Sequence, residues 1–337
     1  MLNKITKKVD ILDNNGVCIN PGYCFKYLFN YNRENIKARE SRIKEWEFYQ
    51  FIEDDYVMQF TIGYASIFDS YSFNFFNIKT GVKYEFGKLR LHKKGEIIYP
   101  NPEESFNLSY SSKKFNICFK NDNGKRHIIF NTINKRYGNV SANVFINGDL
   151  KNEKMCILTP FKESKYQFYL NYKENYYDCV ADINIGKEKY EFKNLKGLVD
   201  SGRGYWPFKQ DWVWSSLTNS IDGHDFGWNL GFGFGDLSHA TENMIFFDHK
   251  GIQLGELDFE IDFENQSTKP ILIKDKNGIF EAKLEPIFDN YTETNFIWIR
   301  NKCHQVFYKA SGYVLINNKK YNFKNIKCFL EHAKNRW

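Results

Sequence analysis

The stretch LVDSGRGYWPFKQDWVWSSL, residues 198–217, concentrates the side chains of this chain that are best suited to chemistry. Asp200 and Arg203 lie on either side of Gly202. A guanidinium can form a forked pair with a carboxylate or with an anionic group of a ligand. Two interpretations therefore remain open for Arg203: a buried ion pair that joins two parts of the fold, or an anion-binding residue.

Arginine is scarce, because only nine of the 47 basic residues are arginines. A chain that uses lysine wherever a cation suffices keeps arginine where its planar fork is needed. We therefore expect Arg42 or Arg203 to form a bidentate bond with a carboxylate. The candidate partners are Glu45, Asp200, Glu242 and Glu331.

Aromatic residues follow directly in the same stretch. Trp212 and Trp214 are two positions apart, so on a strand they face the same side, about 7 Å apart. Pro207 favours an extended conformation at Trp206. These rings form either a plain core or the wall of a pocket, and the sequence leaves both alternatives open.

Glycines alternate in GWNLGFGFGD, but the spacing does not complete the GxGxxG pattern of nucleotide-binding loops. On an extended segment, Gly231, Gly233 and Gly235 leave one face bare while Phe232 and Phe234 fill the other. Such a bare face allows close approach of another backbone or of a ligand, and packing is the favoured interpretation.

A carboxylic acid in an apolar pocket has a raised pKa and can protonate a hydrophobic substrate. Glu242, at the entrance of an apolar strand, is the first candidate for this acid, and Asp200 is the second. Contact with Arg203 would lower the pKa of either carboxyl and remove that role.

Composition excludes several classes of protein. The net charge of +6 comes from dispersed lysines, without the basic block that marks nucleic-acid binding. The sequence contains no run of apolar residues long enough to span a membrane, and no signal peptide is recognised. Seven scattered cysteines without CxxC spacing indicate a reduced, cytoplasmic protein. The histidine spacing predicts neither a metal site nor a cofactor.

Short aromatic and β-branched runs separated by NNG, NDNG, NGD and KNG turns predict strands along nearly the whole chain. The expected fold is all-β, with two antiparallel lipocalin-like (calycin-like) β-barrel domains and few helices. The expected domains are residues 1–195 and 196–337, with the boundary in the glycine-containing segment 193–202. Residues 34–46 are either a helix or a loop that enters a strand.

Motifs in three regions resemble those of the bacterial domain of unknown function 2804 family: RIKEWEFYQF, then RGYWPFKQDWVWSS with NLGFGFGDLSHATEN, and the ending FLEHAKNRW. The first motif departs from the family at Glu47 and Phe48. The family in turn looks similar to carotenoid hydratase and AttH-like proteins, which carry two lipocalin-like domains. The matching positions are Arg42, Glu45, Trp46, Tyr49, Arg203, Gly204, Tyr205, Pro207, Trp214, Asn229, Gly231, Thr241, Glu242, Asn243, Glu331, His332 and Trp337.

The sequence therefore predicts a cavity that binds a hydrophobic, lipid-like or isoprenoid-like molecule. The alternative is an enzyme that protonates, hydrates or isomerises such a molecule through Glu242 or Asp200. The expected ligand-binding residues are Arg42, Glu45, Trp46, Arg203, Tyr205, Trp206, Trp212, Trp214, Asn243, Glu331 and His332.

Overall fold

The structure is a computed structural model that describes residues 2–65, 67–296 and 299–336. Strands β1 to β23 and two short 3-10 helices, η1 (Arg33–Asn35) and η2 (Glu40–Arg42), account for its regular structure. The described residues contain no α-helix, which confirms the predicted all-β class. The segment expected to be a helix or a loop contains these two 3-10 turns and then enters a strand at Ile43.

Most strands of the first half form one twelve-stranded sheet, called the first sheet below. Its main path runs in the order β7 (Lys83–Leu91), β6 (Phe68–Asn77), β5 (Tyr56–Ala65), β4 (Ile43–Glu53), β14 (Glu188–Tyr205), β13 (Ser164–Ile185), β11 (Gly138–Asn147), β10 (Lys125–Asn134), β9 (Phe115–Asp122) and β8 (Phe106–Ser112). Off this path, β12 (Met155–Phe161) pairs with β13 and β2 (Gly22–Cys24). The short strands β1 (Val9–Asp10) and β3 (Phe29–Asn30) form a separate parallel pair.

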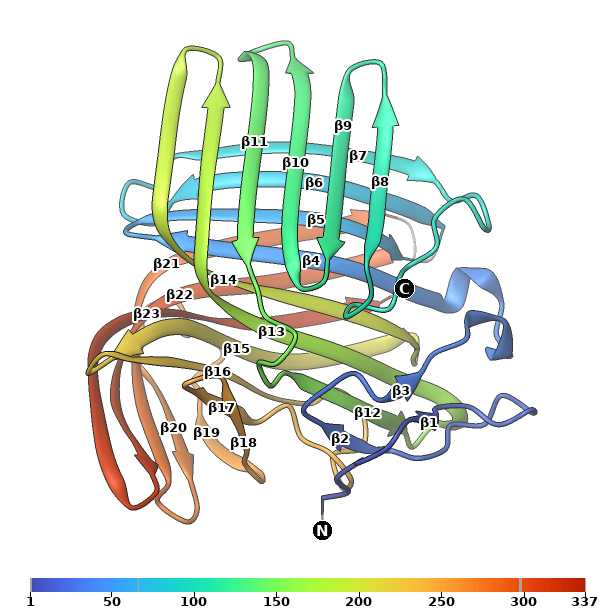
Figure 1. Cartoon of the computed structure of the whole chain (residues 1–337), viewed down its shortest axis with the longest axis vertical. Helices are drawn as coiled ribbons and strands as arrows, with labels where there is room; N and C mark the ends of the chain where they lie inside the picture. Colours follow the sequence, from blue (N-terminus) through green and yellow to red (C-terminus); the bar gives the residue numbers. More distant parts are fainter. Residues whose placement is uncertain (1, 66, 297–298, 337) are drawn as a thin grey trace.

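The first sheet curls so that its two ends pack face to face. Figure 1 shows β8–β11 running nearly at right angles across β4–β7. In β6 the alternate residues Tyr71, Phe73 and Phe75 are buried, as the two-residue period of a half-buried strand requires. The ring of Phe73 packs 5.0 Å from that of Phe130 on β10, so this alternation builds the core between the two layers.

A nine-stranded second sheet follows. Its order is β18 (Lys250–Gln253), β17 (Met244–Phe247), β16 (His224–Phe232), β15 (Lys209–Ile221), β23 (Lys319–Arg336), β22 (Ile299–Ile316), β21 (Phe280–Phe296), β20 (Ile271–Asp275) and β19 (Leu257–Glu260). This sheet also curls around its own core, in which Trp228 on β16 packs 5.4 Å from Phe280 on β21. The predicted architecture of two antiparallel curled sheets is therefore confirmed, each as a half-barrel.

The chain passes from one sheet to the other between β14 and β15, through Trp206, Pro207 and Phe208. The boundary expected after residue 195 falls inside β14, whose residues 196–205 pair with β4. The change of sheet therefore comes ten residues later, and the division of the chain into two domains stays a prediction.

The two sheets pack directly against each other. An apolar cluster joins Val57, Phe76 and Leu198 of the first sheet to Trp214 and Phe307 of the second. The side-chain amide Nε2 of Gln59 on the first sheet donates to the side-chain oxygen Oε1 of Gln305 on the second sheet at 2.6 Å. No helix in the described part of the chain is long and apolar enough to cross a membrane.

Candidate functional site

A cavity of about 400 Å³ lies where β4–β6 of the first sheet face β15 and β21–β23 of the second. Its lining is dominated by aromatic rings, but it includes buried carboxyl and ammonium groups. The side chains with the strongest bearing on function are Lys44, Glu45, Trp46, Tyr64, Tyr169, Lys173, Asp200, Trp206, Trp212, Trp214, Phe234, Glu242, Cys303 and Glu331.

Four of the five tryptophans that the structure describes line this cavity: Trp46, Trp206, Trp212 and Trp214. Phe234 holds two of them edge-on, at 5.3 Å from Trp206 and 5.0 Å from Trp212. The sequence left open whether these rings form a plain core or the wall of a pocket. They do both, because they pack against one another and also line the cavity.

Glycine in the motif DSGRG makes room for one of these rings. A Cβ atom on Gly202 would lie 2.0 Å from the Trp46 ring, far inside van der Waals contact. The indole of Trp46 therefore lies flat over the bare backbone of β14. From there its Nε1 donates to Oδ2 of Asp200 at 2.9 Å.

A polar cluster centres on Lys173 of β13. Its ammonium lies 2.8 Å from Asp200 Oδ1 and 3.8 Å from Glu242 Oε2. It also lies 4.0 Å from the centre of the Trp214 ring, a cation–π arrangement. Asn171 donates a further hydrogen bond to Asp200 Oδ1 at 2.6 Å. Asp200 thus accepts hydrogen bonds from three donors, Trp46, Asn171 and Lys173.

Two other carboxyl groups in the cavity have a raised pKa. Burial raises the pKa of Glu331 to about 7, while the hydrogen bond from Trp212 Nε1 to its Oε1, 3.1 Å long, acts in the opposite direction. Burial also raises the pKa of Glu242, which Lys173 partly offsets. A neutral carboxyl is the form that can donate a proton to a bound molecule.

The three alternating glycines have two different roles. Gly231 leaves room for a carboxyl group, whereas Gly233 and Gly235 lie in the segment that follows the end of β16. Gly231 lies on β16, where an added Cβ would be 3.4 Å from Glu242 Oε2, so its bare face accommodates that carboxyl. β16 ends at Phe232, and Gly233 and Gly235 have positive φ angles of 93° and 86°. The extended segment expected through residue 235 is therefore wrong beyond Phe232.

Arg203 does not line the cavity. Its guanidinium forms a single 2.6 Å contact with Glu47 and donates to the carbonyl oxygens of Trp46, Gly202 and Pro100. The expected bidentate bond to one of four named carboxylates is therefore wrong for Arg203, because its partner Glu47 was not among them.

The other expected site residues divide between the cavity and its surroundings. Glu45 lines the cavity but is paired with Arg33 at 2.9 Å, and Arg42 donates to the carbonyl oxygen of Trp206 at 2.8 Å. Asn243 accepts from the backbone N–H of Gly231 at 2.9 Å.

Two further residues lie away from the cavity lining. Tyr205 packs against the core of the first sheet, and His332 contacts Asp211 at 3.0 Å. Trp337, a position of the family motif, lies outside the described residues.

Sequence reasoning missed the two lysines of the cavity. Lys173 lies in the run YQFYLNYKENYY. A lysine within a run so rich in tyrosine is the sequence feature that could have indicated a buried cation. Burial lowers the pKa of Lys44 to about 7, and neighbouring Arg42 adds to this shift. Among the described residues, no group of three or more His, Cys, Asp or Glu side chains is arranged to hold a metal ion.

Two curled antiparallel sheets packed against each other define the fold class, and solved structures share this fold. Kievitone hydratase from Nectria haematococca is 12% identical over 87% of this chain and 88% of its own, with a TM-score of 0.52. A candidate AttH from Nitrosomonas europaea is 10% identical over 90% of this chain and 96% of its own, with a TM-score of 0.51. At these identities the likeness concerns the fold alone.

The chain belongs to the DUF2804 family, a domain of unknown function, whose sequence profile matches residues 2–337. The resemblance drawn from the sequence motifs is thereby confirmed. No curated protein sequence matches the chain.

Proposed function

We propose that this protein binds a hydrophobic small molecule with one polar group in the cavity between its sheets. The observation that carries the proposal is the convergence of four indole rings and four carboxyl groups, Glu45, Asp200, Glu242 and Glu331, on one space of about 400 Å³. That volume lies within the range of small-molecule sites, which combine apolar walls with a few polar groups.

The distribution of polarity indicates the kind of ligand. The indoles and Phe234 offer an apolar surface suited to an aliphatic or isoprenoid-like chain. Lys173, Glu242 and Glu331 offer both hydrogen-bond donors and acceptors to a hydroxyl, carbonyl or carboxyl group. All seven cysteines are unpaired, which fits a reducing compartment such as the cytoplasm.

Acid catalysis on the same ligand is a second candidate, and the raised pKa of Glu331 favours it. A neutral Glu331 would give its proton to one carbon of a double bond, and the π electrons would form the new C–H bond. Indole faces stabilise the positive charge left on the other carbon. Addition of water at that carbon, with transfer of its extra proton back to the Glu331 carboxylate, completes a hydration. Transfer of a different proton of the cation to the same carboxylate, with formation of a new double bond, completes an isomerisation. The name of kievitone hydratase, a protein of the same fold, agrees with this chemistry.

The first experiment extracts the purified protein with organic solvent and identifies bound small molecules by mass spectrometry. We expect an apolar compound in stoichiometric amount, and expect less of it from Trp214→Phe. Trp228→Phe is the matched control, because Trp228 is buried in the core of the second sheet and does not line the cavity. An empty wild-type protein that also fails to bind added fatty acids or terpenoids would contradict the proposal.

Binding and catalysis are separated by Glu331→Gln, which keeps the shape of the side chain but cannot supply the acid proton. A carrier retains most of its affinity in this variant. An enzyme that uses Glu331 as its acid loses turnover by roughly 10²–10⁴-fold. The same comparison with Glu242→Gln shows which carboxyl supplies the proton.

A further inference from the structure

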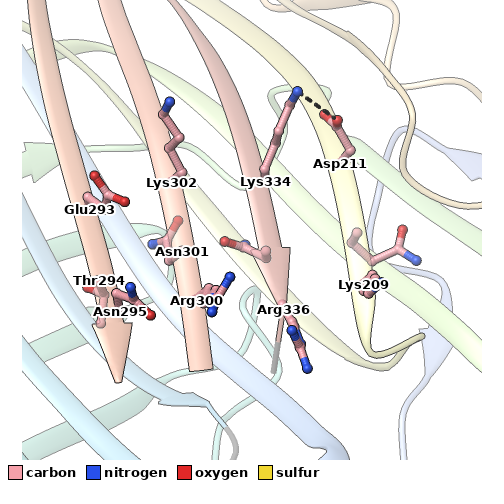
Figure 2. Close-up of a pocket in the computed structure, with 12 residues that line it drawn as sticks. Lys209, Asp211, Glu293, Thr294, Asn295, Arg300, Asn301, Lys302, Lys334 and Arg336 are labelled. Atoms are coloured by element: carbon pink, nitrogen blue, oxygen red, sulfur yellow. Dashed lines mark ion pairs between the residues drawn. The ribbon is translucent and has the colours of Figure 1, made fainter. Parts of the chain in front are cut away.

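A basic hollow of about 480 Å³ lies at the ends of β15, β21, β22 and β23 (Figure 2). Cys303 and Ala333 line the apolar cavity, so the alternate residues Lys302 and Lys334 project from the opposite face of the same strands. The hollow is lined by Lys209, Gln210, Asp211, Glu293, Thr294, Asn295, Arg300, Asn301, Lys302, Lys334, Asn335 and Arg336.

Positive charge dominates this surface, which we call the basic face: Lys209, Arg300, Lys302, Lys334 and Arg336. The two carboxylates of the hollow have partners, since Asp211 contacts Lys334 at 3.7 Å and Glu293 accepts from Tyr291 at 2.5 Å. No carboxylate of the described residues forms an ion pair with Lys209, Arg300 or Arg336. The basic face therefore carries uncompensated positive charge.

The basic face is continuous with the rim of the apolar cavity. Asn301 and Asn335 line both spaces, and the exposed Thr292 lines the cavity on neighbouring β21. Next to Lys209 in the chain, the ring of Phe208 is 38% exposed, and its centre lies 5.5 Å from the guanidinium of Arg42 and 5.3 Å from that of Arg336. An exposed aromatic ring among cations is typical of surfaces that contact lipid headgroups.

We propose that the basic face docks the protein on an anionic lipid bilayer, beside the opening of the cavity. The inference rests on the proposed function, because a bilayer is the reservoir from which a hydrophobic ligand would enter. Charge complementarity favours this partner, since clustered basic residues attract anionic lipids. The cations are spread over β15, β22 and β23, and all but the half-buried Arg336 are exposed, so they suit an extended anionic surface better than one small anion.

The test measures cosedimentation of the full chain with two kinds of vesicle, pure phosphatidylcholine and phosphatidylcholine with roughly 30% phosphatidylglycerol. We expect binding to the anionic vesicles only, weakened by added salt because screening shortens the range of the attraction. The charge-reversal variant Lys209→Glu/Arg300→Glu/Lys302→Glu should bind them at least about tenfold more weakly.

The matched control, Lys113→Glu/Lys135→Glu/Lys187→Glu, makes the same change in net charge. These exposed lysines lie in the turns β8–β9, β10–β11 and β13–β14 of the first sheet. The control should keep wild-type vesicle binding. Circular dichroism and thermal unfolding of both variants establish that loss of binding is not loss of fold.

Equal binding to neutral vesicles, no binding to either kind, or an equal loss in the control variant would each overturn the docking proposal. Failure of the proposed function has a different signature: the wild-type protein binds anionic vesicles but takes up no apolar ligand. Conversely, the charge-reversal variant should still bind a fatty acid delivered in solution, because the lining of its cavity is unchanged.

Discussion

Trp212 on β15 donates its indole N–H to the carboxyl of Glu331 on the adjacent strand β23, across 3.1 Å. The contact fixes the orientation of a carboxyl whose pKa burial raises to about 7. The bond joins an indole of the cavity wall to a carboxyl group that can donate a proton. It therefore links the aromatic lining of the cavity to its acidic groups.

Glu331 should make the stability of the protein depend on pH. Its pKa is about 7 in the folded chain and lies near 4.5 in the unfolded chain, so the folded chain holds the extra proton between these values. The free energy of unfolding therefore falls as pH rises from 4.5 to 7, by about 3 kcal/mol from this group. Glu331→Gln lacks this titrating group. In urea titrations, its free energy of unfolding relative to that of the wild-type protein should therefore increase by about this amount between pH 4.5 and pH 7. Parallel curves for the two proteins would contradict the assignment.

The hydrogen bond from Trp212 should hold this pKa down. Trp212→Phe removes the donor while keeping an aromatic ring, so the pKa of Glu331 should rise above its wild-type value. Carbon-13 NMR of the glutamate carboxyl groups, titrated in both proteins, measures the shift. A midpoint that stays in place or falls would show that the indole does not stabilise the charged carboxylate.

Arg203 should be a stabilising residue. Its side chain is 3% exposed and pairs with that of Glu47, which is 0% exposed. Arg203→Ala leaves that carboxylate buried without its partner and should cost roughly 3–5 kcal/mol of unfolding free energy. Arg300→Ala, at an exposed position, is the control and should change stability by less than about 0.5 kcal/mol. A similar small effect for both substitutions would exclude the buried pair.

Gly202 should be intolerant of any side chain. Gly202→Ala forces the Trp46 indole away from β14 and breaks its hydrogen bond to Asp200, which should cost about 1–3 kcal/mol. Gly87→Ala on exposed β7 is the matched control, because its added Cβ would meet no atom closer than 3.6 Å. Chemical unfolding of both variants tests this prediction, and equal stabilities would contradict the close packing.

The strand pattern was predictable because one face of each sheet is buried, which imposes the two-residue period seen in β6. The position where the chain changes sheet was not. Gly197, Gly202 and Gly204 suggested an interruption, but β14 continues through them because the rings of Phe51, Trp46 and Trp206 pack on their bare backbone. A glycine that ends a strand and one that receives a ring look alike in a single sequence.

The candidate site was predictable in its aromatic residues and in Glu242, but not in Arg203. Positions 200 and 203 are an odd number of residues apart on one strand, so their side chains project to opposite faces of β14. Asp200 lines the cavity, whereas Arg203 pairs with Glu47. Lys44 and Lys173 were missed because lysines in a lysine-rich chain are expected to lie on the solvent-exposed surface. Their burial depends on pairing between strands that are distant in the sequence.

The cavity itself can be narrowed by one substitution. Gly63 on β5 lines it, and an added Cβ would come no closer than 3.4 Å to any neighbouring atom. Gly63→Val should therefore fold normally while its side chain occupies ligand space. Gly87→Val on exposed β7 places the same side chain outside the cavity and serves as the control.

Energy transfer from tryptophan to cis-parinaric acid, a fluorescent fatty acid, tests the central claim most directly, because the four indoles line the proposed binding space. Titration of the wild-type protein and the Gly87→Val variant should give saturable transfer that farnesol displaces by competition. Gly63→Val should bind at least about tenfold more weakly, as expected when a ligand loses contact volume in a filled pocket. Saturable transfer of equal affinity in the Gly63→Val protein, or none in the wild-type protein, would contradict the account.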